Sequence, residues 1–474
     1  MISARIFSPL RTWMVAFGLA LAVIGGHGAA EAQSTAELFS RANTQQMLMR
    51  MEVALARVQA RRGIIPKAAA DEIERTASID FVLPQRVAEE QRRVGHPLVA
   101  LINVWAKVTE GDAGEYIHYG ATTQDIYDSV QLAQCREAAR LFIADLRRVE
   151  EGLLNLAQEH RATPMIGRTV GRHALPLTFG AKVGSWLSEN RRSIERLKGW
   201  IERSNTAMLS GAVGSYAALG PDAFAVEAEV AKELGAGTPF TADWKGARDM
   251  HAEYGELLAI AARSLGRMGQ EVFLLLGDDF NELEEPTENV GSSTMPHKVN
   301  PSYSRTVVQM ARVVPAQAQI LLDWMMTIYE RDQISNADTL GDISIAMERS
   351  TKAAARMVAV LKVHPENMAR NIDRTRGLIM AEEAMFILGE KIGKHTAHEE
   401  VRLAARAAWE KGTSLIEEIN ARPQLAGVAK DMKLEERLDP KKYIGLSAEA
   451  TDRTIAFIKR ARETDASALK PERG

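Results

Sequence analysis

The chain has 474 residues, with 59 Lys and Arg against 62 Asp and Glu, and a formal net charge of −3. This balance excludes a basic nucleic-acid-binding protein, which would carry a clear positive excess. Hydrophobic residues make up 46% and charged residues 26%, so long disordered regions are not expected. A single cysteine, Cys135, excludes an intrachain disulfide framework and a metal cluster built on cysteines.

Residues 1–32 have the pattern of an export signal. Arg5 and Arg11 give a positive n-region, residues 13–24 form a short apolar run, and residues 30–32 read Ala-Glu-Ala, a cleavage pattern. The apolar run is shorter than the ~20 residues of a transmembrane helix. We therefore predict a periplasmic or secreted protein that has no membrane association once the signal is cleaved. An uncleaved anchor is the alternative.

Helical periodicity is the main structural signal in the rest of the chain. In one stretch apolar residues recur at steps of three, four and seven, at Val183, Leu187, Ile194, Leu197 and Ile201. This spacing predicts an amphipathic helix. Strand signals are sparse, and no Asn-Gly hairpin turn occurs. We therefore predict an all-α fold.

The segment from about residue 306 to residue 329 is apolar on all sides and has few charges. A helix of this kind is buried all round, which places it in the centre of a long helical bundle. The predicted organisation is an N-terminal helical domain over residues 33–135, a central bundle over 136–375 and a C-terminal helical domain over 376–474.

One loop has the composition of a binding site. Residues 291–301, here called the signature loop, read GSSTMPHKVNP, a glycine and two serines followed by two prolines. Lys298 offers a cation and Asn300 an amide, which together suit an anionic, oxygen-rich ligand. The glutamates among residues 282–288 have no histidine or ordered ligand spacing, so we predict no metal site there.

The signature loop matches the GSSxMPxKxNP motif of the fumarase/aspartase superfamily nearly letter for letter. Residues 118–129 resemble the H-x-G-x-T-S-x-D segment of this superfamily, and residues 167–174 resemble its GRTxxxxA segment. Residues 438–445 resemble the ending of adenylosuccinate lyases and 3-carboxy-cis,cis-muconate cycloisomerases. The order and separation of the motifs also agree, so the resemblance spans nearly all of the chain after the signal.

The resemblance implies a three-domain fold around a long helical bundle. It also implies a homotetramer in which each active site is assembled from three subunits. The family chemistry needs no metal or organic cofactor. A base removes a proton beside a carboxylate, and a C–N or C–O bond then breaks, usually releasing fumarate.

Individual roles follow from the matched motifs. Ser292 matches the catalytic base, and His118 matches a histidine that contacts substrate at the catalytic centre. Lys298 and Asn300 match groups that grip the substrate carboxylates. The remaining predicted substrate-binding positions in the three motifs are Thr122, Thr123, Gln124, Arg168, Ser293 and Met295. Donors aimed at developing negative charge are usually the largest electrostatic contribution to such catalysis.

The chain departs from the family pattern at two linked positions. Adenylosuccinate and argininosuccinate lyases carry a catalytic histidine after Gly-Arg-Thr, and this position is Val170 here. The glutamate that partners this histidine is replaced by Arg305. Because valine cannot donate a proton, the leaving group must be protonated by another residue or depart without help. His173 is a candidate catalytic residue in its place, and Arg305 is predicted to recognise a further carboxylate.

Residues 329–332 resemble the Glu-Arg-Asp segment of adenylosuccinate lyases, which implies that Arg331 contacts substrate. The phosphate-binding arginine of that segment falls at Leu340, so the nucleotide phosphate would lack its bidentate partner. We therefore predict an exported lyase that performs β-elimination on a small polycarboxylate or an N-succinyl-type compound. The alternatives are lactonisation of a carboxymuconate, and a non-catalytic helical tetramer.

Overall fold

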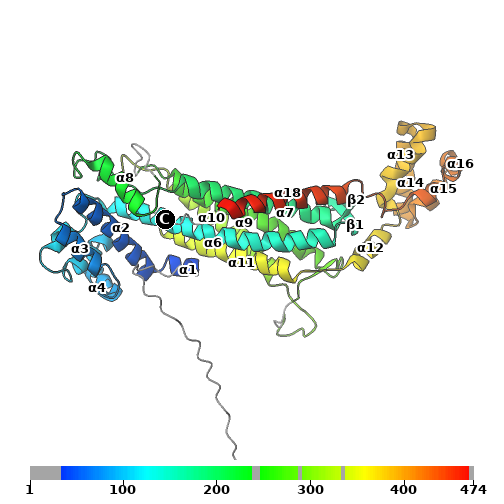
Figure 1. The fold of residues 1–474 in the computed structure, drawn as a ribbon. Coiled ribbons are helices and arrows are strands. Elements are labelled where there is room, and N and C mark those ends of the chain that lie inside the picture. Colours follow the sequence, from blue (N-terminus) through cyan, green and yellow to red (C-terminus); the bar gives the residue numbers. More distant parts are fainter. Residues whose placement is uncertain (1–33, 238–245, 287–290, 333–336, 469–474) are drawn as a thin grey trace, which may run out of the picture.

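The computed structural model describes residues 34–237, 246–286, 291–332 and 337–468. The predicted signal, residues 1–32, lies outside the described residues. The molecule is elongated (Figure 1): long helices lie side by side in the middle, with shorter helices at both ends. The expected helical fold with a long central bundle is confirmed.

Six helices form the central bundle: α6 (Thr123–Glu159), α7 (Phe179–Arg203), α9 (Asp249–Leu275), α10 (Tyr303–Asp323), α11 (Asp338–Val360) and α18 (Ser447–Ala468). They share one apolar core that includes the buried rings of Phe142, Trp200 and Tyr254. At 1.5 Å per residue, the 37 residues of α6 span about 55 Å. This helix therefore sets the distance between the two ends of the bundle.

The last helix, α18, packs against α7 and places Ile455 and Ile458 in the bundle core. A buried ion-pair cluster holds it there. The Asp465 carboxylate accepts hydrogen bonds of 2.5 Å from both Arg191 and Lys198, and it lies 2.9 Å from the Arg147 guanidinium. Residues 376–474 therefore supply both a separate helical cluster and one helix of the bundle.

Short helices form the N-terminal end: α1 (Thr35–Leu38), α2 (Arg41–Arg61), α3 (Lys67–Thr76), α4 (Pro84–Val94), α5 (Pro97–Ala106), η1 (Ala113–Tyr116) and α8 (Ala223–Glu233). Their core surrounds Met49, Ile73 and Trp105. The first turns of α6 enter this core through Ile126 and Val130. The N-terminal end is thus packed directly onto the start of α6.

The opposite end of the molecule carries the helices α12 (Pro365–Asp373), η2 (Leu378–Met380), α13 (Ala381–Ile392), α14 (Lys394–Lys411), α15 (Leu415–Asn420), α16 (Pro423–Asp431) and α17 (Leu434–Arg437). From α13 to α17 these helices have a core of their own, with Leu388, Ala404 and Leu425 fully buried.

Two small antiparallel sheets lie at this end of the bundle. Strand β1 (Pro164–Thr169) pairs with β2 (Arg172–Thr178), and β3 (Leu283–Glu284) pairs with β4 (Lys362–Val363). The β1–β2 hairpin was not expected. Its two-residue turn is Val170-Gly171, with φ of +52° and +72°, a conformation that Asn-Gly usually supplies. Val170 is β-branched, and such residues rarely adopt the left-handed conformation, so no sequence signal marked a turn here.

The segment 306–329 was expected to be buried on all sides, but within one chain only one of its sides is buried. Helix α10 buries Val307, Met310, Val314 and Leu321 against its neighbours. On its other side and beyond its end, the chain leaves six large hydrophobic side chains exposed: Ile320, Leu322, Met325, Met326, Ile328 and Tyr329. Among the described helices, none has both the length and the apolar content needed to cross a membrane.

Candidate active site

The predicted site residues fall into two groups at opposite ends of the bundle. His118, Thr122, Thr123, Gln124 and Arg331 lie where α6 begins. The other group lies near the end of α6, beside the β1–β2 hairpin, and consists of Arg168, His173, Ser292, Ser293, Met295, Lys298, Asn300 and Arg305. The length of α6, about 55 Å, separates the two groups within one chain.

The base of the signature loop is fixed by one buried carboxylate. Glu285 accepts backbone N–H bonds of 2.7 Å from Ser302 and Tyr303 and of 2.9 Å from Ser304. These are unpaired N–H groups of the first turn of α10, where a negative charge also complements the helix dipole. Glu285 thus joins the two ends of the loop.

The hydroxyl of Ser292 lies inside a tight turn of the loop. Its Oγ accepts backbone N–H bonds from Thr294 at 3.3 Å and from Met295 at 3.0 Å. The side-chain amide of Asn300 donates to the carbonyl of Gly291 and closes the turn. Hydrogen bonds to the charged form of an acid favour that form. Two N–H donors therefore stabilise negative charge on Ser292 Oγ.

The signature loop is polar and open. Ser293, Met295 and Lys298 are exposed, and no carboxylate of the described residues forms an ion pair with Lys298. Arg305 is also exposed and without an ion-pair partner in the described part of the chain. It lies in the first turn of α10, where the helix dipole disfavours a cation. The two charges are thus available to an anionic ligand.

Arg168 makes internal contacts. Its guanidinium donates to both oxygens of Glu282, at 2.7 and 3.1 Å, and lies 4.5 Å from the ring centre of Phe280. Glu282 is fully buried and also accepts a 2.8 Å bond from Asn371. Arg168 therefore ties the hairpin to the strand that leads into the signature loop, and its predicted contact with substrate stays a prediction.

The tip of the hairpin is exposed. Val170 is 100% exposed, and His173 stands on the following strand, also exposed. Partial burial and the nearby Arg168 guanidinium lower the pKa of His173 below its ordinary value. Its imidazole is therefore mainly neutral near pH 7.

A histidine–glutamate pair exists at the other end of the bundle. His118 Nδ1 lies 2.7 Å from Glu52 Oε1, and Glu52 is only 2% exposed. Burial lowers the pKa of His118, but the hydrogen bond to Glu52 and the charges of Glu52 and Asp125 outweigh it, so the pKa is raised. His118 has a φ of +67°, a strained value for a residue other than glycine. Glu52 lies in no motif, so no sequence signal marked it as a functional residue.

The two threonines are held by a buried aspartate. Asp125 accepts backbone N–H bonds from Thr122 at 2.8 Å, Ser210 at 2.9 Å and Gly211 at 3.2 Å. Asp125 thus fixes the loop that carries the threonine pair at the start of α6. The next residues, Thr123 and Gln124, line a cavity of about 1020 Å³.

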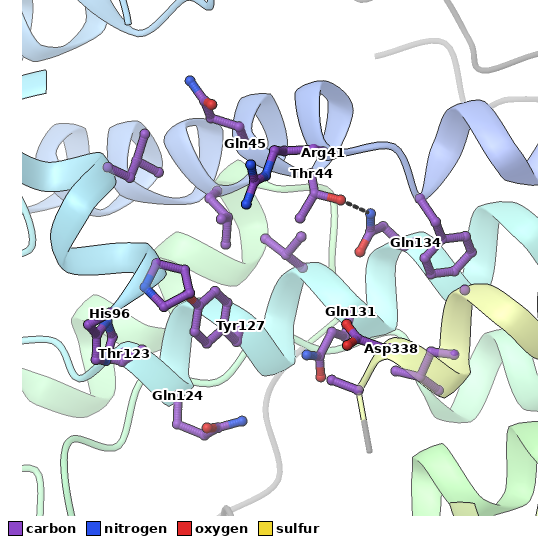
Figure 2. Close-up of a pocket in the computed structure, with 18 of the residues that line it drawn as sticks. Arg41, Thr44, Gln45, His96, Thr123, Gln124, Tyr127, Gln131, Gln134 and Asp338 are labelled. Carbon is purple, nitrogen blue, oxygen red and sulfur yellow. Dashed lines mark hydrogen bonds between the residues drawn. The ribbon is translucent and has the colours of Figure 1, made fainter. Parts of the chain in front are cut away.

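This cavity lies between α2, α5, α6 and α11, and Figure 2 shows its α2 and α6 walls facing each other. Arg331 lines it as well, so Arg331 and Thr123 face the same cavity. His96 and Arg41 also line it, and neither belongs to a recognised motif that could have marked it. Across the described ranges, no group of three or more His, Cys, Asp or Glu side chains is arranged to hold a metal ion.

Comparisons with known proteins agree with these motifs. A family model described as "Lyase" matches residues 28–316, and one described as "Adenylosuccinate lyase C-terminus" matches residues 377–454. The chain belongs to the fumarase/aspartase superfamily. It is therefore a member of an enzyme superfamily of lyases and cycloisomerases.

Its relatives in this superfamily are named for different activities. The adenylosuccinate lyase of Methanocaldococcus jannaschii is 36% identical over 89% of this chain and 93% of its own length. The N-acetyl-S-(2-succino)cysteine lyase of Enterococcus italicus is 34% identical over 89% of this chain and 94% of its own. The structure of the 3-carboxy-cis,cis-muconate lactonizing enzyme of Pseudomonas putida is 30% identical with a TM-score of 0.84, over 91% of this chain and 98% of that one.

Proposed function

We propose that this superfamily member is an exported lyase that performs β-elimination on a small polycarboxylate or N-succinyl-type substrate and releases fumarate. The observation that carries the proposal is the pair of backbone N–H groups on Ser292 Oγ, at 3.3 and 3.0 Å. A serine hydroxyl is a poor base unless its anionic form is stabilised. The exposed loop offers that stabilisation, together with the cation of Lys298, which no carboxylate in the described ranges pairs.

In the proposed reaction Ser292 removes a proton from the carbon beside a substrate carboxylate. The electron pair is held by that carboxylate, and the bond to the leaving group on the next carbon then breaks. Lys298, Asn300 and the threonine pair bind the carboxylates, and Arg305 adds a further positive charge. These groups act where negative charge develops, which is where fixed donors and cations contribute most.

The proposed site is shared between copies of the chain, as in a homotetramer. Ser292 and His118 lie near opposite ends of α6, a helix about 55 Å long, so one copy cannot bring them to the same substrate. The exposed apolar side chains of Ile320, Leu322 and Met326 offer a surface for a second copy. Mixing inactive Ser292→Ala and His118→Ala chains should restore part of the activity. No recovery in mixed oligomers would contradict shared sites.

The proposed proton donor is the His118–Glu52 pair. Val170 leaves the hairpin tip without an acid, and the raised pKa of His118 keeps more of its imidazole protonated than usual. Nδ1 is engaged by the carboxylate, so Nε2 is the atom that delivers the proton, in the manner of a carboxylate-supported histidine. His173 is the second candidate, but its lowered pKa leaves less of the protonated form.

The bond that breaks is proposed to be C–N or C–O. A relative that is 34% identical is named for a sulfur-linked succinyl compound, which adds C–S cleavage to the test panel. A second candidate function is lactonisation of a carboxymuconate. It is favoured by the structural likeness to the lactonizing enzyme and by the absence of an acid at Val170.

The test is an ultraviolet absorbance screen of the purified protein with N-succinyl compounds, S-succinyl thiols, substituted succinates and 3-carboxy-cis,cis-muconate. We expect fumarate release that is lost in Ser292→Ala and retained in Ser185→Ala, a change at an exposed serine of α7. Consumption of the muconate to a lactone would favour the second candidate. Equal turnover by Ser292→Ala would contradict both.

Export is proposed from residues 1–32 and has its own test. The protein recovered from the periplasm or the medium should begin at Gln33. A full-length chain that remains in the cytoplasm would contradict it.

A further inference from the structure

The cavity near the threonine pair has a second wall that no motif contributes. Arg41, the first residue of α2, lines this wall and donates a 2.9 Å hydrogen bond to Gln91 of α4. The described residues provide no carboxylate partner for Arg41. Figure 2 places Arg41 on α2, across the cavity from Gln131 of α6. Arg41 therefore presents an uncompensated charge to the cavity.

The position of Arg41 costs stability. The N-terminal turn of a helix carries partial positive charge, which disfavours a cation there. Its neutral partner Gln91 does not offset this charge. Because neither the helix dipole nor an ion pair stabilises the charge of Arg41, this charge is available to an anion in the cavity.

The facing wall also has a polar atom without a partner. Gln131 Oε1 is buried and accepts no hydrogen bond from any residue that the structure describes. Buried polar atoms are nearly always paired, so an atom of this kind in a cavity wall calls for a donor from a ligand or an ordered water. Gln131 and Arg41 thus offer an acceptor and a cation to one bound group.

The other charged residues in the cavity wall limit the negative charge that a bound anion can carry. Three carboxylates, those of Asp332, Asp338 and Asp342, line the same cavity. Two lining arginines have no ion pair among the described residues, Arg41 and Arg331, whereas Arg248 is paired with Asp128 at 2.8 Å. A dianionic phosphate would meet three carboxylates and too few cations. A single carboxylate matches one guanidinium, which can bind it through two N–H bonds.

We propose that Arg41 and Gln91 form a subsite for a carboxylate carried by the leaving group of the substrate. This inference rests on the proposed elimination and names the class of compound that the elimination releases. That compound is a carboxylic acid with an N–H or similar donor near Gln131, such as an amino acid or an aminobenzoic acid, and not a nucleotide. Arg41 acts here as a specificity-determining residue.

Binding of two matched probes tests this subsite. The probes are N-(4-carboxyphenyl)aspartate and N-phenylaspartate, which share the succinyl half and differ by one carboxylate on the leaving group. Calorimetry on the oligomeric Ser292→Ala protein measures their Kd without turnover. We expect the carboxylated probe to bind about tenfold more tightly. Arg41→Gln should remove most of this preference for the carboxylated probe, and Arg41→Lys should keep part of the preference.

The matched control is Arg50→Gln, at an exposed cation of α2 outside the cavity lining. It should leave the ratio of the two Kd values unchanged. Equal binding of the two probes, no binding of either, or a ratio that survives Arg41→Gln would overturn the subsite. If the ratio behaves as expected but the protein with Ser292 intact releases no fumarate from either probe, the subsite stands and the proposed elimination fails.

Discussion

Arg168 and Glu282 join the β1–β2 hairpin to the strand that precedes the signature loop, through two hydrogen bonds of 2.7 and 3.1 Å. Glu282 is fully buried, so its charge depends on this arginine and on Asn371. Removing one partner of a buried pair leaves an uncompensated charge, at a cost of about 3–5 kcal/mol.

The first prediction concerns this pair. Arg168→Met should lower the free energy of unfolding by about 3 kcal/mol because Glu282 remains buried without its main partner. Urea denaturation measures the effect. Arg172→Met, at an exposed residue of the same hairpin, is the control and should change it by less than about 0.5 kcal/mol. Equal effects of the two substitutions would show that the Arg168 pair is not a structural tie.

The second prediction is a pH dependence. Glu52 raises the pKa of His118, so the pair stabilises the fold fully at low pH and loses this contribution as the pH rises through the raised pKa. If His118 donates the proton, activity should fall over the same range. Glu52→Gln should move this fall to lower pH, because the carboxylate that raises the pKa of His118 is removed. The pH profile of kcat, together with a titration of the His118 ring by NMR, measures the change.

The matched control for this profile is Glu74→Gln, at a glutamate of the same N-terminal end that pairs with Arg57 and not with a histidine. Its profile should match that of the unaltered protein. A Glu52→Gln profile that keeps the original position would remove His118 from the proposed proton transfer.

How far the sequence could predict the structure is clearest at the hairpin and at Glu52. The long helices follow from apolar periodicity, and the signature loop follows from an eleven-residue motif, because both signals are local in the sequence. The Val170-Gly171 turn carries none of the residues that favour a left-handed conformation, so no local signal marked it. Glu52 and His118 are 66 positions apart, and only the packing of α2 beside that loop joins them.

Arg168 illustrates a different limit. Its place in a recognised motif implied a substrate contact, which stays a prediction, and gave no sign of the bond to Glu282 that the structure shows. A motif records that a residue type is required, but it does not distinguish contact with the substrate from support of the residues that make it. The apolar α10 segment is similar: its pattern required burial on all sides, and one chain supplies only half of it.

The third prediction concerns the end of the chain. Asp465 is 1% exposed and accepts hydrogen bonds from Arg191 and Lys198, which outweigh burial and lower its pKa. The contribution of Asp465 is therefore present above its unfolded pKa and lost as the pH falls through the folded value. Asp465→Asn should reduce the unfolding free energy by about 3 kcal/mol at pH 7, and the difference should shrink in acid.

Denaturation at several pH values measures this difference, with Glu463→Gln at an exposed neighbouring position as the control. A loss that does not depend on pH would mean that Asp465 acts through packing and not through its charge.

The fourth prediction tests the strain in the hairpin turn. Val170 has a φ of +52° and its side chain is fully exposed, so within one chain the residue bears the cost of a left-handed conformation without any packing in return. Val170→Asn should stabilise the protein by about 1 kcal/mol, because asparagine tolerates this conformation. Thermal unfolding measures the gain, and Val213→Asn, at an exposed valine outside the hairpin, is the control. A loss of stability in Val170→Asn that grows with protein concentration would instead mean that a second copy buries this valine, and the hairpin tip would then belong to the interface between copies.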